Sequence, residues 1–102
     1  GGKEVILSYV PAGNYVGGAF LGEAVRPRGR HLALRIRLIG TAPIREVALM
    51  RDGQPWRTWS PRGRRFETAA RLASGECRGR CFYVRMIQAD TNMAWSSPIW
   101  VD

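Results

Sequence analysis

Apolar and polar residues alternate along the middle of the chain. Aliphatic side chains occupy every second position of the stretch 31–39, namely Leu32, Leu34, Ile36 and Leu38. The other positions of this stretch include His31, Arg35 and Arg37. Because successive side chains of an extended chain point to opposite faces, a period of two is typical of a strand with one buried face. Residues 31–39 are therefore predicted to form a half-buried β-strand.

A second alternating stretch covers residues 81–89. One face carries Phe82, Val84 and Met86, and the other carries Tyr83, Arg85 and Ile87. The first face is wholly apolar and the second is mixed, which favours a strand that is partly covered on both faces. This strand is predicted to be central in its sheet.

Turn-forming residues separate the apolar stretches at short and fairly even spacing. The predicted strands are residues 3–9, 15–20, 31–39, 44–51, 55–60, 64–72, 81–89 and 97–101. Asp52-Gly53 predicts a hairpin with a type I′ turn, and only the stretch 67–74 favours a short helix. The chain is thus predicted to be all-β, an immunoglobulin/fibronectin-like β-sandwich of seven to eight strands, with one domain over residues 1–102.

The net charge of the 102-residue chain is +8, and Lys3 is the only lysine among its 16 basic residues. Basic side chains bind phosphates and other polyanions, so an anion-binding surface is one interpretation. The chain is also rich in alanine and glycine, and a GC-rich genome would produce the same bias toward arginine. An electropositive surface without specificity for nucleic acid is therefore expected.

The four tryptophans raise the question of a stacking platform for sugars or bases. Trp56 and Trp59 are three positions apart, so on a regular strand they point to opposite faces and one of them is in the core. Trp100 lies between Ile99 and Val101, so either Trp100 or its two neighbours face solvent. We expect one of Trp95 and Trp100 to be buried, and structural packing is the favoured role for the set.

Residues for catalysis or metal binding are sparse. His31 is the only histidine and is expected to be a solvated surface residue, and the eight acidic residues are scattered. Cys77 and Cys81 with one histidine are too few ligands for a structural zinc site; they are compatible with free thiols and with a disulfide alike. We expect no catalytic residue, no metal and no cofactor.

No apolar run approaches the ~20 residues that a membrane-spanning helix needs, and the first residues lack the pattern of a signal peptide. No contact with a membrane is expected. The sequence leaves the localisation open.

Two parts of the chain are similar to a known family. The first is Gly40-Thr41-Ala42-Pro43-Ile44, followed by Arg51-Asp52-Gly53. The second runs from Tyr83 to Asp90 and on through Ala94-Trp95-Ser96-Ser97-Pro98-Ile99-Trp100-Val101. Together they resemble the C-terminal β-sandwich region of bacterial PHP-type metallohydrolases, and the last two strands are also similar to the end of fibronectin type III modules.

The resemblance implies a non-catalytic domain that follows a metal-dependent hydrolase domain. The metal ligands of that family lie in the preceding domain, so no catalytic residue is carried over to this chain. Asp90-Thr91-Asn92 and the segment Cys77–Cys81 depart from the family pattern. The first hypothesis is therefore an accessory domain whose partner is the upstream domain of the same polypeptide. The alternative is an independent module that binds a glycan or another anionic ligand.

Counting strand directions in a Greek-key sandwich, with 15–20 continuing the first strand, assigns the turns to two ends. The turns near 26–30, 51–54 and 74–80 are expected to meet at one end and to form an anion surface from Arg26, Arg28, Arg30, Arg78 and Arg80. The turns near 40–43, 61–65 and 90–96 are expected to meet at the other end, beside the N-terminus. A candidate docking loop there contains Asp90, Asn92 and Trp95. A hairpin at 11–14 would instead move the N-terminus to the arginine-rich end.

Overall fold

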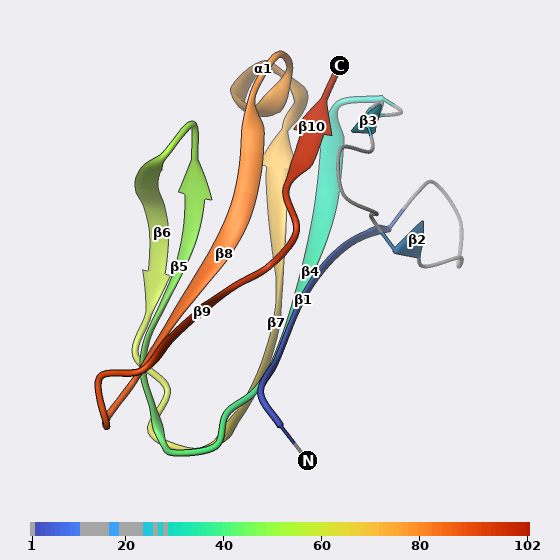
Figure 1. The fold of residues 1–102 in the computed structure, drawn as a ribbon. Coiled ribbons are helices and arrows are strands. Elements are labelled where there is room, and N and C mark those ends of the chain that lie inside the picture. Colours follow the sequence, from blue (N-terminus) through green and yellow to red (C-terminus); the bar gives the residue numbers. More distant parts are fainter. Residues whose placement is uncertain (1, 11–16, 19–23, 26, 28) are drawn as a thin grey trace.

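The computed structural model describes residues 2–10, 17–18, 24–25, 27 and 29–102. These residues form two β-sheets that face each other, with a single turn of helix at one end (Figure 1). The elements are β1 (Glu4–Val10), β2 (Gly17–Gly18), β3 (Ala24–Val25), β4 (His31–Ile39), β5 (Ile44–Arg51), β6 (Gln54–Trp59), β7 (Arg65–Ala73), α1 (Ser74–Cys77), β8 (Cys81–Gln88), β9 (Met93–Trp95) and β10 (Ile99–Val101). The chain is an all-β, immunoglobulin/fibronectin-like sandwich, as predicted.

The first sheet has the strand order β2-β1-β4-β7, and all its pairs are antiparallel. Its two inner strands are β1 and β4, and the exposed and buried residues of β4 alternate as the period of two predicted. β7 pairs with β4 over its whole length, from Arg65 to Ala73. This pairing corrects the prediction for residues 67–74, because the helix begins only at Ser74, where the ladder with β4 has ended.

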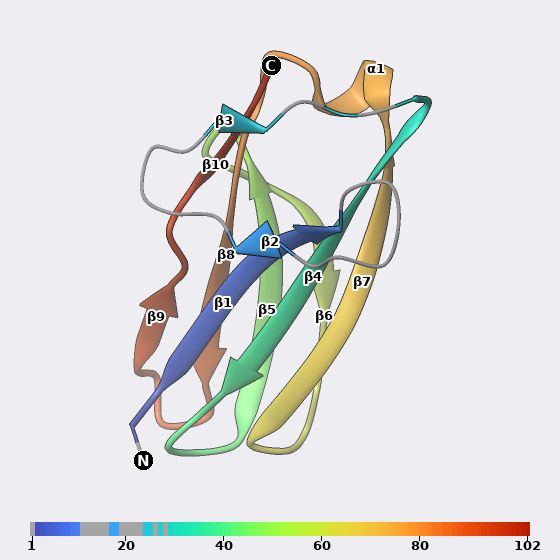
Figure 2. The same cartoon turned by 90° about the vertical axis from the view of Figure 1, so that its right-hand side faces the viewer.

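The second sheet has the order β3-β10-β8-β5-β6, and β9 also pairs with β8. β3 runs parallel to β10, and the other pairs are antiparallel. Figure 2 shows β1, β4 and β7 crossing in front of β5, β6 and β8. β9 was not predicted. Residues near 90–96 were expected to form a turn, whereas residues 93–95 pair with β8.

The core fills the space between the two sheets. It comprises fully or almost fully buried aliphatic, aromatic and methionine side chains, chiefly Leu34, Ile36, Leu38, Val47, Leu49, Leu72, Phe82, Val84, Met86 and Ile99. The inner faces of β4 and β8 contribute most of this set, in agreement with the alternation in the sequence. Burial of this apolar surface is the main force that holds the sheets together.

The predicted strand over residues 15–20 is only partly described. Gly18 pairs with Ser8 and Gly17 with Tyr9, both in antiparallel register. The segment therefore turns back along β1, and the prediction that it continues the first strand was wrong. The remaining residues of 15–20 lie outside the described part of the chain.

A β-bulge in β6 places Trp56 and Trp59 on the same face. Trp59 lies opposite Val47, Arg57 opposite Leu49, and Pro55 opposite Met50, so that one extra residue, Trp56, enters the strand. Both indoles pack against the core, Trp56 with its ring centroid 5.8 Å from that of Phe82 and Trp59 at 6.0 Å from Phe66. The expectation that they face opposite ways was wrong, because a bulge shifts the period of two by one residue.

The other two tryptophans are on the surface. Trp95 is 56% exposed and Trp100 is 51% exposed, whereas Ile99 and Val101 are buried. Residues 99 and 101 thus face the core, which was one of the two arrangements expected for β10. The prediction that one of Trp95 and Trp100 is buried was wrong.

The turns follow the local chemistry of the sequence. Asp52 and Gly53 have φ values of 51° and 83°, as a type I′ hairpin requires, which confirms that prediction. At the other end of the sandwich, a Cβ on Gly40 would lie 2.7 Å from the carbonyl oxygen of Ala42 and 2.9 Å from Oε1 of Gln88. Gly40 is therefore required by close packing.

We expect Gly40→Ala to lower the free energy of unfolding by about 1–3 kcal/mol, because the new methyl group overlaps backbone and a buried amide. The matched control is Gly75→Ala, where a Cβ meets nothing within 4 Å. Urea unfolding followed by circular dichroism measures both. Equal midpoints for the two variants would contradict the packing at Gly40.

We expect Trp56→Ala to cost about 2–4 kcal/mol, somewhat less than for a fully buried aromatic residue. Trp100→Ala serves as the control and should change the free energy of unfolding by only ~0.5–1 kcal/mol, because about half of its indole is already in water. A larger loss for Trp100→Ala than for Trp56→Ala in urea unfolding would refute the placement of the two rings.

Candidate functional site

The outer face of the first sheet is mostly polar and charged, apart from Ile6 of β1, which lies opposite Arg37 and is 41% exposed. The register of β1, β4 and β7 places His31, Arg35, Arg37, Arg65, Glu67 and Arg71 on it. These side chains are exposed, and Nη2 of Arg71 lies 3.3 Å from Nδ1 of His31. This is the expected surface for a sheet that faces water, and His31 is solvated as predicted.

The outer face of the second sheet is apolar by comparison. Trp95 lies opposite Arg85, Met93 opposite Ile87, and Trp100 opposite Cys81, so these side chains share the face that points away from the core. We define the aromatic face as Tyr83, Ile87, Met93, Trp95 and Trp100. Exposure of 39% for Met93 and more than half for both indoles leaves a large part of this face in contact with water.

The strand beside β8 continues the aromatic face. Met50 lies opposite Tyr83, and Ala48 lies opposite Arg85, yet both are buried although they are on the outer side of β5. One ion pair crosses the face, with Nη2 of Arg85 at 3.2 Å from Oε1 of Glu46. Nε of Arg85 is buried and has no hydrogen-bond partner. The described part of this outer face is therefore largely apolar, with one ion pair across it.

Two of the three predicted docking residues hold a loop together. Asp90 accepts hydrogen bonds from Nε2 of Gln88 (3.0 Å) and from the backbone N–H of Asn92 (3.1 Å) through Oδ1, and from Nδ2 of Asn92 (3.0 Å) through Oδ2. These bonds, led by the one from Gln88, hold the pKa of Asp90 below its usual range. Asp90 and Asn92 thus shape the loop; both are exposed, as is Trp95 on β9.

The turns gather at the two ends of the sandwich as predicted. At one end, which we call the N-terminal pole, turns 40–43, 60–64 and 89–92 meet through backbone hydrogen bonds such as Gly40 N–H to Arg64 O and Ala89 N–H to Pro43 O. At the opposite C-terminal pole, Ser74 N–H donates to Arg30 O, and Asp52 N–H donates to Cys81 O.

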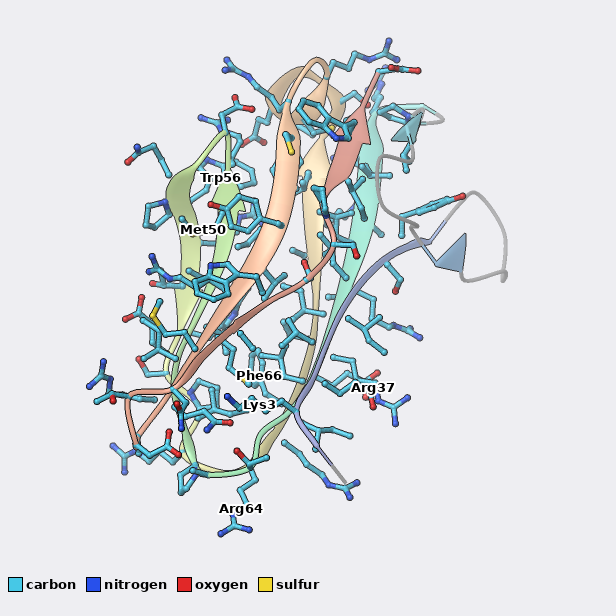
Figure 3. The ribbon with its side chains drawn as sticks, in the orientation of Figure 1. Lys3, Arg37, Met50, Trp56, Arg64 and Phe66 are labelled. Carbon is cyan, nitrogen blue, oxygen red and sulfur yellow. The ribbon has the colours of Figure 1, made fainter. Side chains whose placement is uncertain are left out.

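The chain enters at the N-terminal pole. Glu4 pairs with Ile39, the charge of Lys3 acts on Asp90, and Figure 3 shows Lys3 near the end that carries Arg64. β1 pairs with β2 in antiparallel fashion, yet this does not move the entry of the chain to the other end. The hairpin at 11–14 that was expected to move the N-terminus to the arginine-rich end lies outside the described residues.

The predicted anion surface is only partly described. Arg30, Arg78 and Arg80 lie at the C-terminal pole, whereas Arg26 and Arg28 fall outside the described residues. Nη1 of Arg80 forms an ion pair with Asp52 at 2.9 Å. A hydrogen bond from Cys81 N–H and the contact with Arg80 lower the pKa of Asp52.

Carboxylates offset most of the positive charge of the arginines at the C-terminal pole. Arg51, which donates from Nη1 to the carbonyl oxygen of Glu76 at 3.2 Å, brings the described arginines there to four. Asp52, Glu76 and Asp102 bring three carboxylates to the same end. The anion surface remains a prediction, with little excess charge in the described part.

The described residues include no group of three or more histidine, cysteine or carboxylate side chains placed to hold a metal ion. Cys77 and Cys81 are free thiols, and burial raises the pKa of both. A raised pKa leaves little reactive thiolate at neutral pH. In the described part of the chain, the one short helix is far from the length that a membrane span requires.

Comparison with other proteins gives two relatives and no family. No family model matches the chain. An uncharacterized protein of Chlamydia muridarum is 32% identical over 116 residues, which cover 99% of this chain and 18% of that protein. An uncharacterized protein of Chlamydia pneumoniae is 33% identical over 84 residues, covering 72% of this chain and 13% of that protein. The chain spans less than a fifth of the length of either relative.

We expect Asp90→Ala to destabilise the chain at neutral pH, because the loop loses a carboxylate that accepts hydrogen bonds. A lowered pKa in the folded state contributes stability above the unfolded value near 3.8, and that stability is lost as the pH falls through the folded pKa. The difference in urea midpoint between wild type and variant should therefore shrink below pH 3.8. A difference that stays constant from neutral to acid pH would show that the charge of Asp90 plays no part.

Proposed function

We propose that the chain is a non-catalytic interaction module of a longer polypeptide and that its aromatic face packs against a neighbouring domain of that polypeptide. The observation that carries this proposal is the contrast between the two outer faces. The first sheet presents charged side chains to water, whereas the second presents two half-exposed indoles and Met93 on a mostly apolar surface.

The energetics favour a protein partner. Aromatic and methionine side chains are enriched in interfaces, and tryptophans are frequent hot spots of binding. Covering the exposed half of two indoles removes apolar surface from water, which stabilises the contact at roughly 25 cal/mol per Å² before the costs of association.

The comparisons support a place in a longer protein. The chain matches 18% of one relative and 13% of the other, and each match is the size of a single domain. On the sequence resemblance, the neighbouring domain is a PHP-type metal-dependent hydrolase upstream of this chain. Trp95 lies on the strand that follows loop 89–92 of the N-terminal pole, where the chain enters, so a preceding domain would lie near the aromatic face.

A carbohydrate-binding module is the second candidate, since two exposed indoles on one face can stack on sugar rings. The rest of the face argues against it. Met93 and Ile87 offer no hydrogen bond to a sugar hydroxyl, Arg85 and Glu46 are paired with each other, and Tyr83 carries the one hydroxyl group of the aromatic face. We therefore favour a protein partner.

The test is hydrogen exchange of this 102-residue chain alone and within the complete polypeptide encoded by its gene. We expect amides of β9 and β10 to exchange more slowly in the complete polypeptide, because the aromatic face is covered there. Amides of β4 and β7, in the sheet with the charged outer face, serve as the internal control and should change little.

The variant Trp95→Ser/Trp100→Ser should remove the added protection while leaving the fold intact, since both side chains are about half exposed. Its matched control is Arg35→Ser/Arg71→Ser on the opposite outer face. Equal exchange of β9 and β10 in the short and the complete chains would refute the proposal. Binding of the short chain to a glycan array, abolished by the tryptophan variant, would favour the carbohydrate module.

A further inference from the structure

A shallow hollow lies at the N-terminal pole and shares no residue with the aromatic face. Its volume is about 420 Å³, and it lies between the turns that join β4 to β5 and β6 to β7. Apolar and polar residues both line it, namely Pro43, Ile44, Arg45, Ser60, Pro61, Arg62 and Ala89. Pro43, Pro61 and Ala89 supply an apolar surface, the buried Ile44 forms part of its floor, and the two arginines supply positive charge.

The turns around the hollow are fixed to one another. Gly40 N–H donates to Arg64 O at 2.7 Å, and Ile44 N–H donates to Gly63 O at 2.8 Å. Ala89 N–H donates to Pro43 O at 2.8 Å, which ties the loop after β8 to the same site. A surface that is already ordered loses little conformational entropy when it binds a ligand.

The arginines at this pole are free of internal partners. Arg45, Arg62 and Arg64 are exposed, and none of their guanidinium groups has an ion pair or hydrogen bond within the described part of the chain. Figure 3 shows the side chain of Arg64 extending away from the sandwich. Arg80 and Arg85, in contrast, are paired with carboxylates. In the described part of the chain, three unpaired arginines thus lie at the N-terminal pole together with the carboxylate of Asp90, while Arg30 and Arg78 are unpaired at the opposite pole.

The chemistry of the site selects a class of ligand. Guanidinium groups bind carboxylates in a bidentate geometry. Single-stranded nucleic acids are held largely by stacking of bases on aromatic rings, and none of the residues that line the hollow is aromatic. A ligand that matches both the arginines and the apolar surface carries carboxylates and aliphatic groups together.

We propose that this hollow, the basic groove, binds an extended acidic segment of a partner protein, with Glu or Asp side chains on Arg45 and Arg62 and aliphatic side chains against Pro43, Pro61 and Ala89. This site is separate from the aromatic face and does not depend on the proposed function. The partner is a second polypeptide, and its acidic residues provide the specificity.

Fluorescence anisotropy of the 102-residue chain tests the proposal. The probe is a fluorescein-labelled peptide of Glu-Leu-Glu-Pro repeats, and the control peptide has Gln in place of Glu. We expect the acidic peptide to bind at physiological salt and the Gln peptide to bind more weakly. Arg45→Gln/Arg62→Gln should raise the Kd of the acidic peptide roughly 2- to 30-fold, as expected for the loss of two exposed ion pairs.

The matched control is Arg35→Gln/Arg78→Gln, which makes the same change in net charge on the outer sheet face and at the opposite pole. It should leave the Kd nearly unchanged, because charges beyond the Debye length of about 8 Å are screened. Equal weakening by both variants, or equal binding of the two peptides, would overturn the proposal. So would the absence of binding.

Two further measurements distinguish an acidic-peptide site from a general polyanion site and from binding on the aromatic face. Single-stranded DNA or a heparin oligosaccharide that binds more tightly than the acidic peptide, with the same sensitivity to Arg45→Gln/Arg62→Gln, would identify a polyanion site and overturn the peptide proposal. Trp95→Ser/Trp100→Ser should retain peptide binding. Loss of binding in that variant would place the peptide on the aromatic face instead of the basic groove.

Discussion

The buried amide of Gln88 holds together the turns at the N-terminal pole. The basic groove lies between turns of this pole, and the loop that leads into β9 of the aromatic face starts there. The side chain of Gln88 is fully buried; Oε1 accepts a hydrogen bond from Thr41 N–H at 2.9 Å, and Nε2 donates to Asp90 at 3.0 Å. One polar group thus joins the turn after β4 to the loop after β8. Because a buried amide without partners costs about 1–3 kcal/mol, both segments are constrained to the positions that satisfy it.

The constraint at Gln88 extends to the functional surfaces. The loop that it holds leads into β9, which carries Met93 and Trp95, and the turn that it holds is bonded through Gly40 to residue 64. The aromatic face and the basic groove therefore lie on rigid backbone, although most of the residues that line them are in turns or in a three-residue strand. Rigid placement of exposed groups suits a binding module, since less entropy is lost on association.

The outer faces of the two sheets differ in polarity. The outer face of the first sheet is suited to water, and the outer face of the second sheet is suited to a protein partner. Charge on the outer face of β4 and β7 keeps that side in water, whereas the face around β8 combines indoles, methionine and a single ion pair. The arginines also differ in whether they form ion pairs. Arg80 pairs with Asp52 at the C-terminal pole, whereas Arg45, Arg62 and Arg64 at the N-terminal pole have no ion pair in the described part of the chain, although Asp90 lies at that pole. Net charge alone does not reveal where an anionic partner can bind.

The sequence by itself determined the fold class, the long strands and the ends at which the turns gather, because alternation and turn chemistry act over a few residues. Strands 31–39 and 44–51 and the Asp52-Gly53 turn follow directly from these local rules. Only the tertiary structure decided which tryptophans are buried, since a single bulged residue in β6 turns Trp56 inward. It also decided which arginines are paired, because ion pairs such as Arg80–Asp52 join residues far apart in the chain.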